Sequence, residues 1–344
     1  MKAWLLEKTF DLANGKTPLR FADVPDPSPL ANEVLIQVLC CGICHTEIDE
    51  IEGRTPPPLY PIIPGHQVVG LVIKNGAEAR RFKVGDRVGV AWISSACGQC
   101  EFCVAGLENL CPEFKATGRD RNGGYAEYIS VDERFAYTIP ATFTDEQAAP
   151  LLCAGAIGYR SLQLANLKDG HTLGLSGFGA SGHLVLKIAK YRYPASKIFV
   201  FARNEDEQAF ARSLGSDWAG DFAAKPPSRM NAIIDTTPAW IPIMSSLQNL
   251  KPGGRLVINA IRKEAKDRQA LADLNYRDHL WMEKEIKSVA NITRKDVEEF
   301  LTLAAAMRIV PEAEIYPFEN ANDALVDLKN KHTRGAKVLR VKRP

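Results

Sequence analysis

The sequence predicts a two-domain α/β protein, in which a β-rich, barrel-like domain is combined with a doubly wound parallel-sheet domain. Its 344 residues exceed what a single hydrophobic core usually sustains. The first part contains short β-branched runs interrupted by Pro and Gly, whereas from about residue 155 strands alternate with Gly-rich turns and amphipathic helices. We therefore expect residues 1–154 and 290–344 to form the first domain and residues 155–289 to form the second.

In the first domain, two β-branched runs predict strands at Glu33–Val38 and Val68–Ile73. Between them, Thr55–Pro61 is too rich in proline to be helical, because proline lacks an amide donor and restricts the residue before it. A loop is expected there. The final segment predicts one helix, Lys295–Met307, and a terminal strand, Lys337–Val341, which return to the first domain.

In the second domain, the pattern of strand, Gly-rich turn and amphipathic helix occurs twice, and two further strands follow. The turn Lys251–Gly254 announces the last of these strands. The predicted strands are Thr172–Ser176, Lys197–Phe201, Ala232–Asp235 and Arg255–Ala260, and the predicted helices are Ser181–Lys190 and Glu205–Leu214.

Composition excludes several classes of function. Charged residues make up 24% of the chain and the formal net charge is +2, so no strong field attracts nucleic acid or an anionic membrane. No run approaches the roughly 20 apolar residues needed to cross a bilayer. The amino terminus lacks the pattern of a secretion signal. We expect a cytoplasmic protein without nucleic-acid or membrane partners.

Four of the eight cysteines fall in one short segment, which we call the cysteine lobe (residues 95–113). Without a secretion signal, cysteines favour metal binding or reduced thiols over disulfides. Four thiols so closely spaced suit a tetrahedral site, and zinc at such a site is structural. Zinc-binding interaction proteins contain similar segments, so the lobe alone does not indicate an enzyme. The four residues are Cys97, Cys100, Cys103 and Cys111.

Three further potential ligands are dispersed along the chain: Cys44, His66 and Cys153. Two thiolates and an imidazole leave one tetrahedral position open for water or a substrate oxygen, as in catalytic zinc sites. Taken alone, Cys153 in its apolar run would more often be a core thiol. Cys40 and Cys41 match no ligand position and are expected to be buried thiols.

A glycine-rich turn predicts dinucleotide binding. It follows the strand Thr172–Ser176, opens a helix, and consists of Gly177, Phe178, Gly179, Ala180, Ser181 and Gly182. A helix amino terminus there would offer free amides to the pyrophosphate. At the end of the next strand, Ala202 and Arg203 stand where a carboxylate would hold the ribose of NAD. A guanidinium in that place favours the 2′-phosphate of NADP, although Arg203 could also point into solvent or stack on adenine.

Taken together, these motifs resemble the zinc-containing medium-chain alcohol dehydrogenase family of the bacterial type. The resemblance rests on five segments in order, Cys41–Thr46, Gly65–Gln67, the cysteine lobe, Leu152–Gly155 and the glycine turn. It implies a GroES-like catalytic domain and a Rossmann cofactor domain. It also implies one catalytic and one structural zinc ion, and hydride transfer between an alcohol and a nicotinamide cofactor, with NADP(H) favoured over NAD(H).

The resemblance also assigns roles around the catalytic zinc. Thr46 would accept the alcohol proton, and His45 would lie near the pyrophosphate unless it is a plain surface histidine. Asp49 stands where many relatives carry a relay histidine, and a carboxylate with an ordinary pKa near 4 is a weaker relay at neutral pH. Glu47 takes the place of the aspartate that orients the ligand histidine. Gln67 replaces a glutamate that can approach the metal, which should leave the zinc a stronger Lewis acid.

Two more residues, Trp92 and Arg294, each have two possible roles. Trp92 would be either a wall of the substrate cleft or a core aromatic residue. Arg294 would either approach the pyrophosphate or be a solvated residue at a helix start. The resemblance also implies a homo-oligomer, because relatives are commonly dimers or tetramers.

Two rival functions remain open at this point. A zinc-binding interaction protein would explain the cysteine lobe but not the glycine turn. A zinc-free quinone or enoyl reductase would share the fold and the cofactor turn but have no use for either metal site.

Overall fold

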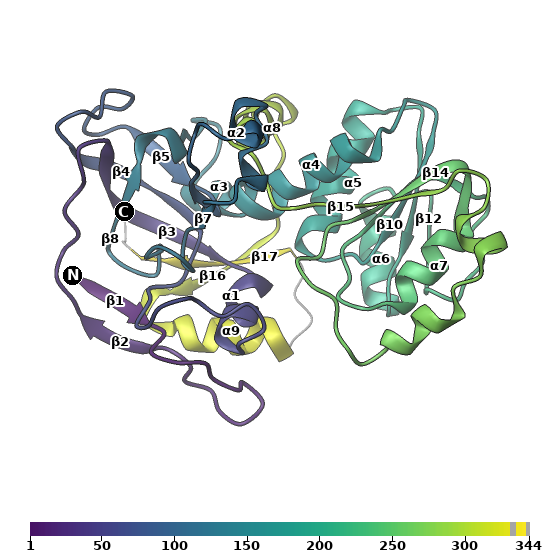
Figure 1. The fold of residues 1–344 in the computed structure, drawn as a ribbon, viewed down its shortest axis with the longest axis horizontal. Coiled ribbons are helices and arrows are strands. Elements are labelled where there is room, and N and C mark those ends of the chain that lie inside the picture. Colours follow the sequence, from purple (N-terminus) through teal and green to yellow (C-terminus); the bar gives the residue numbers. More distant parts are fainter. Residues whose placement is uncertain (331–334, 342–344) are drawn as a thin grey trace. The chain divides into compact units, whose positions relative to one another are not determined.

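The computed structural model describes residues 1–330 and 335–341, so the last residues of the expected first domain lie outside the described part. The chain divides into two compact units. Unit 1 contains residues 1–156 and 292–344, and unit 2 contains residues 157–291. Both are shown in Figure 1. In the described part of the chain, no helix combines the length and apolar character needed to span a bilayer.

Unit 1 is built on a seven-stranded sheet in the order β16-β17-β3-β4-β5-β9, with β8 pairing β3. The long strand β3 pairs antiparallel with β4, β8 and β17, so segments far apart in sequence meet on it. The strands are β3 (Glu33–Ile43), β4 (Gln67–Asn75), β5 (Arg87–Val90), β8 (Tyr128–Asp132), β9 (Ala136–Thr138), β16 (Ala313–Pro317) and β17 (Ala336–Arg340). Two small antiparallel pairs accompany it, β1 (Lys2–Leu5) with β2 (Arg20–Asp23), and β6 (Ile93–Ser95) with β7 (Lys115–Ala116).

The predicted strands of unit 1 are confirmed, and β3 continues five residues beyond its predicted end. The proline-rich segment Thr55–Pro61 forms neither helix nor strand, as expected. The prediction of a single C-terminal helix was wrong, because α9 (Ala321–Asn330) follows α8 (Arg294–Met307). The sequence of α9 is short and mixes apolar with charged residues, and it packs through buried positions such as Leu325 and Leu328. The other helices of this unit are α1 (His45–Ile51), α2 (Glu101–Val104) and α3 (Asp145–Pro150).

Unit 2 is a six-stranded, fully parallel sheet in the order β12-β11-β10-β13-β14-β15. The chain starts in the middle at β10, winds outward to one side through β11 and β12, and then returns to the other side at β13. This is the doubly wound order, and it confirms the predicted fold class. The strands are β10 (Thr172–Ser176), β11 (Lys197–Phe201), β12 (Trp218–Gly220), β13 (Met230–Asp235), β14 (Leu250–Ile258) and β15 (Glu285–Ser288).

Helices α4 (Ala156–Ala165), α5 (Ala180–Arg192), α6 (Glu205–Ser213) and α7 (Ile241–Asn249) follow the strand–helix alternation (Figure 1). Two strand predictions are matched residue for residue, at β10 and β11. The turn Lys251–Gly254 lies within β14 and not before it, because the ladder with β13 shifts register there and accommodates the extra residues. Apolar residues of β11, β13, β14 and α7 form a buried core, including Phe199, Ile233, Leu247 and Leu256.

Candidate active site and metal centres

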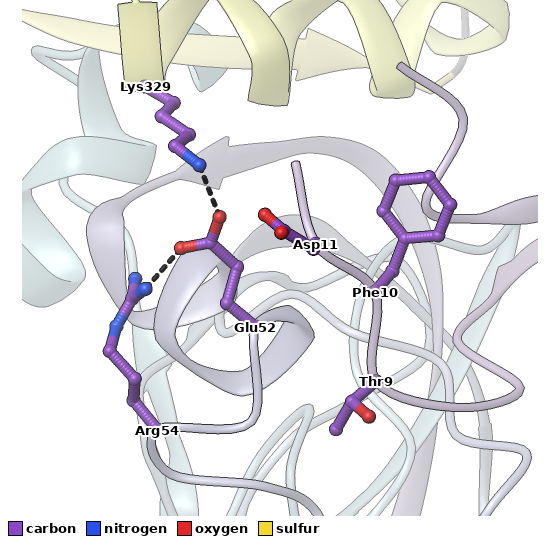
Figure 2. Close-up of a pocket in the computed structure, with 6 residues that line it drawn as sticks. All are labelled: Thr9, Phe10, Asp11, Glu52, Arg54 and Lys329. Carbon is purple, nitrogen blue, oxygen red and sulfur yellow. Dashed lines mark hydrogen bonds and ion pairs between the residues drawn. The ribbon is translucent and has the colours of Figure 1, made fainter. Parts of the chain in front are cut away.

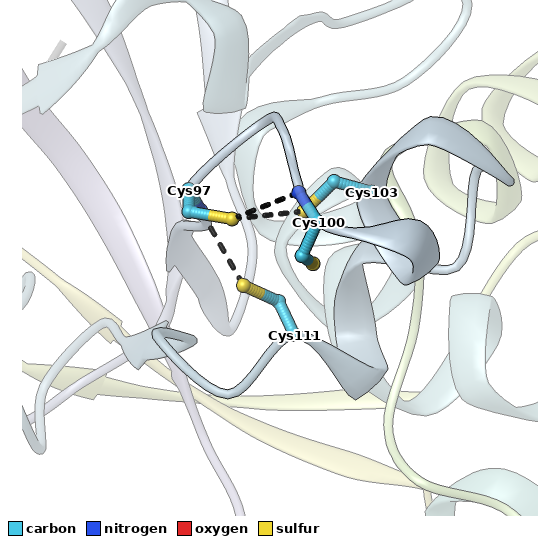
Figure 3. Close-up of side chains that lie close together, drawn as sticks. All are labelled: Cys97, Cys100, Cys103 and Cys111. Atoms are coloured by element: carbon cyan, nitrogen blue, oxygen red, sulfur yellow. Dashed lines mark hydrogen bonds between the residues drawn. The ribbon is translucent and has the colours of Figure 1, made fainter.

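The cysteine lobe brings its four thiols into one group (Figure 3). Their sulfur atoms all lie within 4.8 Å of one another. Cys97 follows β6, Cys100 and Cys103 lie at the start and within α2, and Cys111 ends the short helix η1 (Glu108–Leu110). Gly98 has a φ of +78°, a left-handed conformation that lets the chain turn back on itself between the first two cysteines.

Backbone amides point at these sulfur atoms. The amide of Cys100 donates to Cys97 Sγ at 3.4 Å, and the amide of Glu113 donates to Cys111 Sγ at 3.3 Å. Amide donors, first that of Gln99 and then that of Cys100, lower the pKa of Cys97 to about 7. Such donors favour thiolates, the form that binds a metal. Four converging sulfurs with amide support are the donor set of a structural zinc site.

A second group joins three residues that are distant in sequence: Cys44, His66 and Cys153. His66 Nε2 lies 3.6 Å from Cys44 Sγ and 3.2 Å from Cys153 Sγ. His66 is buried, at 1% exposure, whereas both cysteines are half-buried. All three belong to unit 1. The fold therefore places together the three residues that the sequence marked as dispersed candidate ligands.

Local structure fixes each member of this group. Cys44 is the N-cap of α1, and its Sγ accepts a hydrogen bond from the Thr46 amide at 3.3 Å. Glu47 completes a capping box, because its Oε2 accepts from the Cys44 amide at 2.8 Å. The other oxygen, Oε1, lies 2.6 Å from His66 Nδ1. One buried glutamate thus positions two candidate ligands and leaves His66 Nε2 facing the sulfurs.

Cys153 lies in η3 (Leu151–Gly155), a π-helical turn between α3 and α4. Such turns are rare and often occur at functional sites, because the extra residue redirects a side chain from the regular helical course. The residues around Cys153 are buried, but Cys153 itself is half-buried. This separates it from a core thiol such as Cys40, which is fully buried in β3.

The protonation of this group is set by its neighbours. Hydrogen bonding to Cys153, burial and the carboxylate of Glu47 raise the pKa of Cys44 well above its ordinary value. Burial opposes the imidazolium of His66, but Glu47 and Cys44 outweigh it and hold the pKa of His66 well above its usual value. A site that keeps protons in this way without a metal would release them when a cation binds. The donor set, two thiols and an imidazole with an oriented tautomer, fits zinc.

The glycine turn lies between β10 and α5 and shows a distinct role for each glycine. Gly177 has a φ of +89°, and a Cβ there would come within 2.6 Å of Thr236 Oγ1. A Cβ on Gly182 would lie 2.7 Å from the carbonyl oxygen of Gly177, so the helix packs closely on the turn. Around Gly179, by contrast, no atom lies within 4 Å of a Cβ in the described structure. Tight turn, close packing and one open face are the features of a pyrophosphate cradle.

Ala202 and Arg203 follow β11, beside this turn, because the Gly177 amide donates to the Phe201 carbonyl at 2.9 Å. Ala202 is buried, whereas the Arg203 side chain is 67% exposed and pairs with Glu207 at 3.0 Å. No carboxylate occupies position 202.

Comparison with known proteins places these features in a family. Residues 30–141 match the family model described as "Alcohol dehydrogenase GroES-like domain". A probable alcohol dehydrogenase, AdhA, of Mycobacterium tuberculosis (strain CDC 1551 / Oshkosh) is 39% identical, over 98% of this chain and 97% of the relative. The chain belongs to the zinc-containing medium-chain alcohol dehydrogenase family.

Other alcohol dehydrogenases are similar to this chain in sequence or in fold. An alcohol dehydrogenase of Geobacillus stearothermophilus is 30% identical, over 95% of this chain and 97% of the relative. Among solved structures, the cinnamyl alcohol dehydrogenase SbCAD4 of Sorghum bicolor is 26% identical with a TM-score of 0.83, over 98% of this chain and 97% of that one. Like the alcohol dehydrogenases of this family, the protein is an oxidoreductase.

Other residues that the family resemblance marked are distributed around the Cys44–His66–Cys153 group. His45 and Thr46 form the first turn of α1, with His45 exposed and Thr46 half-buried. Asp49 is buried further along the same helix, where its Oδ1 accepts from Arg54 Nε at 2.7 Å. Because a permanently charged guanidinium holds this carboxylate, Asp49 has a structural partner that competes with the predicted relay role. Gln67 begins β4, and its side chain lies over Gly42, where a Cβ would come within 2.7 Å of Gln67 Oε1.

Trp92 and Arg294 both have neighbours in unit 1 of this dehydrogenase. The Trp92 ring is half-buried and lies 5.3 Å from that of Phe114, which is also half-buried. Arg294 begins α8, where its Nε donates to Glu108 Oε1 at 3.0 Å. Its guanidinium also lies 5.3 Å from the Phe135 ring centre. A predicted pyrophosphate contact for Arg294 therefore competes with this ion pair.

Sequence reasoning missed one acidic residue of the dehydrogenase site, Glu50. It is 1% exposed on α1, three residues after Glu47 and thus on the same helix face. Burial and the nearby charge of Glu47 raise the pKa of Glu50 well above its usual value. The sequence offered one signal for Glu50, its spacing of three residues from Glu47 in a segment that also carries apolar residues.

A polar surface pocket of unit 1 lies apart from these groups (Figure 2). Three of its charged residues are already paired, since Glu52 contacts both Arg54 and Lys329. None of the predicted site residues lines it, so it is not a candidate substrate site. The lining residues are Thr9, Phe10, Asp11, Glu52, Arg54 and Lys329.

A buried histidine of unit 2 should make the stability of this dehydrogenase depend on pH. His183 is fully buried in α5, its Nδ1 lies 3.1 Å from the Gly179 carbonyl, and burial lowers its pKa to about 4. In the unfolded chain this histidine takes up a proton near pH 6.5. The contribution of neutral, buried His183 to the free energy of unfolding is therefore fully present above pH 6.5 and is lost as the pH falls toward 4. Between pH 7 and pH 4.5, wild type should lose roughly 2 to 3 kcal/mol more than His183→Gln.

Urea unfolding followed by tryptophan fluorescence measures this difference. His171→Gln, outside α5, is the matched control and should keep the wild-type pH dependence. Parallel pH curves for wild type and His183→Gln would contradict the assignment.

Proposed function

We propose that this dehydrogenase is zinc-dependent and transfers a hydride between an alcohol and a nicotinamide dinucleotide, with NADP(H) preferred. The convergence of Cys44, His66 and Cys153 carries the proposal, because two thiols and an oriented imidazole leave an open coordination position. The cysteine lobe would hold a second, structural zinc ion. A zinc-free reductase would have no use for either group.

In the proposed reaction, a zinc ion held by these three residues supplies Lewis acidity toward the substrate oxygen. The residues of the chain provide the rest. Glu47 Oε1 holds the proton of His66 on Nδ1, which keeps Nε2 available as a ligand atom. The Thr46 hydroxyl accepts the alcohol proton, and it is well placed to do so because its own amide is fixed on Cys44 Sγ. The half-buried position of Thr46 gives that proton a route outward.

The cofactor is proposed to bind at the glycine turn, with its pyrophosphate on the open face of Gly179 and against the first amides of α5. Ala180, Ser181 and Gly182 contribute those amides. The absence of a carboxylate at Ala202 and the exposed guanidinium of Arg203 support the preference for NADP(H).

Arg203→Ala tests that preference. We expect the Kd for NADPH to rise roughly tenfold or more, because a charge-assisted contact with the 2′-phosphate is lost, while the Kd for NADH stays within about twofold. Fluorescence titration with both cofactors measures the two values. Arg268→Ala, which removes an exposed arginine of the same unit, should change neither. Equal loss for NADPH and NADH would contradict the proposed role.

The proposed function as a whole is tested by a panel of primary, secondary and aromatic alcohols and aldehydes, assayed with both cofactors while the zinc content is measured. The expected result is oxidation of at least one alcohol class by a protein with two zinc ions per chain. Cinnamyl-type alcohols belong in the panel because of the likeness to SbCAD4. Full activity in a protein free of zinc would overturn the proposal.

We also propose that the protein is a homo-oligomer through β15. Within the described residues β15 pairs only with β14, and all its residues are exposed, including Ile286 at 49%. An open edge strand that carries an exposed isoleucine is suited to pairing with the same strand of a second copy. Sedimentation should show a dimer or tetramer that Ile286→Lys dissociates and that Leu59→Lys, at an exposed loop residue, leaves intact. A wild-type monomer at micromolar concentration would contradict this.

A further inference from the structure

Unit 2 contains a buried charged network that the proposed reaction does not use, the Asp235 network (Ser176, Asp235, Thr237 and Lys263). Asp235 Oδ1 accepts from Ser176 Oγ at 2.6 Å and from Thr237 Oγ1 at 2.9 Å. Its Oδ2 accepts from Lys263 Nζ at 2.5 Å, and the same ammonium donates to the Thr237 carbonyl at 2.6 Å. The Asp235 side chain is 0% exposed and that of Lys263 is 8% exposed.

The network lies where the strand order of the sheet reverses. Ser176 ends β10 and Asp235 ends β13, and the two are register partners in the ladder. The residue after β10 is Gly177 of the glycine turn, and the residue after β13 is Thr236, whose Oγ1 would lie 2.6 Å from a Cβ on Gly177. In open parallel sheets, ligands bind outside the carboxyl ends of the strands at this switch point. The network thus lies directly beneath the proposed pyrophosphate cradle.

We propose that Lys263 is a positioning residue that balances the charge of Asp235 and so allows the anionic dinucleotide to bind at the glycine turn. The inference rests on the proposed function, because it takes the dinucleotide to be the ligand of this turn. Asp235 ties the ends of β10 and β13 together, and Lys263 brings the segment after β14 onto the same point. Three loops are held in one arrangement by a single carboxylate.

The negative charge of the proposed ligand explains why Asp235 is paired with a lysine beneath the glycine turn and not with a neutral side chain. A buried carboxylate at the end of β13 would repel a pyrophosphate, and repulsion is strong where water is excluded. Burial raises the pKa of Asp235 above its usual value, and Lys263 opposes this shift. The Lys263 ammonium on Oδ2 favours the ionised form of Asp235, which accepts all its hydrogen bonds, and balances the charge of that form toward the ligand. Removing Lys263 alone would leave the buried Asp235 carboxyl below the cofactor without its counter-charge.

Three variants separate charge balance from general stability: Lys263→Met, Asp235→Asn and the double variant. Lys263→Met should raise the Kd for NADPH, NADH and the competitor ADP at least tenfold. It should raise the KM for the cofactor similarly, with kcat at saturating cofactor within about twofold. Asp235→Asn should bind within about threefold of wild type, because it removes the repelling charge. The double variant should recover to within about threefold of wild type.

Fluorescence titration of NADPH and NADH, with ADP as a displacing probe, gives these values without any turnover. Lys266→Met, at an exposed lysine three residues further on, is the matched control and should bind as wild type. If Lys263→Met does not fold, Asp235→Asn and the double variant still test the inference, since neither leaves a buried carboxylate unpaired.

Wild-type affinity in folded Lys263→Met would overturn the proposal. So would an Asp235→Asn or double variant that binds NADPH as weakly as Lys263→Met, because hydrogen-bond geometry and not charge would then set the affinity. A wild-type protein that binds neither nicotinamide cofactor would instead show that the proposed function had failed. Binding without alcohol oxidation would leave the Lys263 comparison fully measurable.

Discussion

Cys153→Ala should lower kcat/KM for alcohol oxidation by roughly 1,000-fold or more and reduce the zinc content from two ions per chain to one. A loss of that size corresponds to about 4 kcal/mol of transition-state stabilisation. The physical reason is that Cys153 is one of three side chains whose donor atoms meet, and a site with only Cys44 and His66 would bind zinc weakly. Steady-state kinetics and elemental analysis of the same sample measure both effects.

The matched control is Cys40→Ala, which removes a buried thiol of β3 that belongs to neither cysteine group. It should keep both zinc ions and most of the activity, with a stability loss of about 1 to 2 kcal/mol for the small cavity. Unaltered zinc content in Cys153→Ala would contradict the proposed ligand set. Equal loss of zinc in both variants would mean that folding and not coordination was affected.

Gly179→Ala and Gly177→Ala should damage the dehydrogenase in different ways, although both lie in one turn. Gly179→Ala should weaken the cofactor Kd roughly tenfold or more with a stability change within about 0.5 kcal/mol, because its new methyl group meets no protein atom and enters the space of the ligand. Gly177→Ala should lower the free energy of unfolding by about 1 to 2 kcal/mol or more, because φ is +89° there and Thr236 is in the way.

Urea unfolding and NADPH titration, performed on both variants, check this contrast. Gly170→Ala supplies a control for the backbone cost alone, since Gly170 also has a positive φ but no atom near its Cβ and lies outside the turn. It should cost stability and leave the Kd unchanged. A Gly179→Ala variant that binds NADPH as wild type would place the pyrophosphate elsewhere.

The sequence predicted much of the fold because local patterns decide strands and turns. β10 and β11 could be bounded to the residue, since each is a short apolar run next to a glycine turn or a helix cap. The second C-terminal helix, α9, was missed because it is only 10 residues long, although its buried residues follow the spacing of an amphipathic helix (Ala321, Ala324, Leu325 and Leu328). The position of the turn at Lys251–Gly254 was also misjudged, because a strand can absorb such a turn only through the register shift of its partner.

For the site, the sequence by itself determined the chemical inventory: four clustered thiols, three dispersed ligands and a glycine turn without a ribose-binding carboxylate. Sequence spacing is enough to predict the thiol group of the cysteine lobe, because four cysteines within 15 residues remain close to one another in any compact fold of that segment. Only the tertiary structure decided that Cys44, His66 and Cys153 share one place, that Asp49 and Arg294 hold ion-pair partners, and that Lys263 lies against Asp235. Contacts between distant residues depend on strand order and helix packing, and no local pattern encodes those.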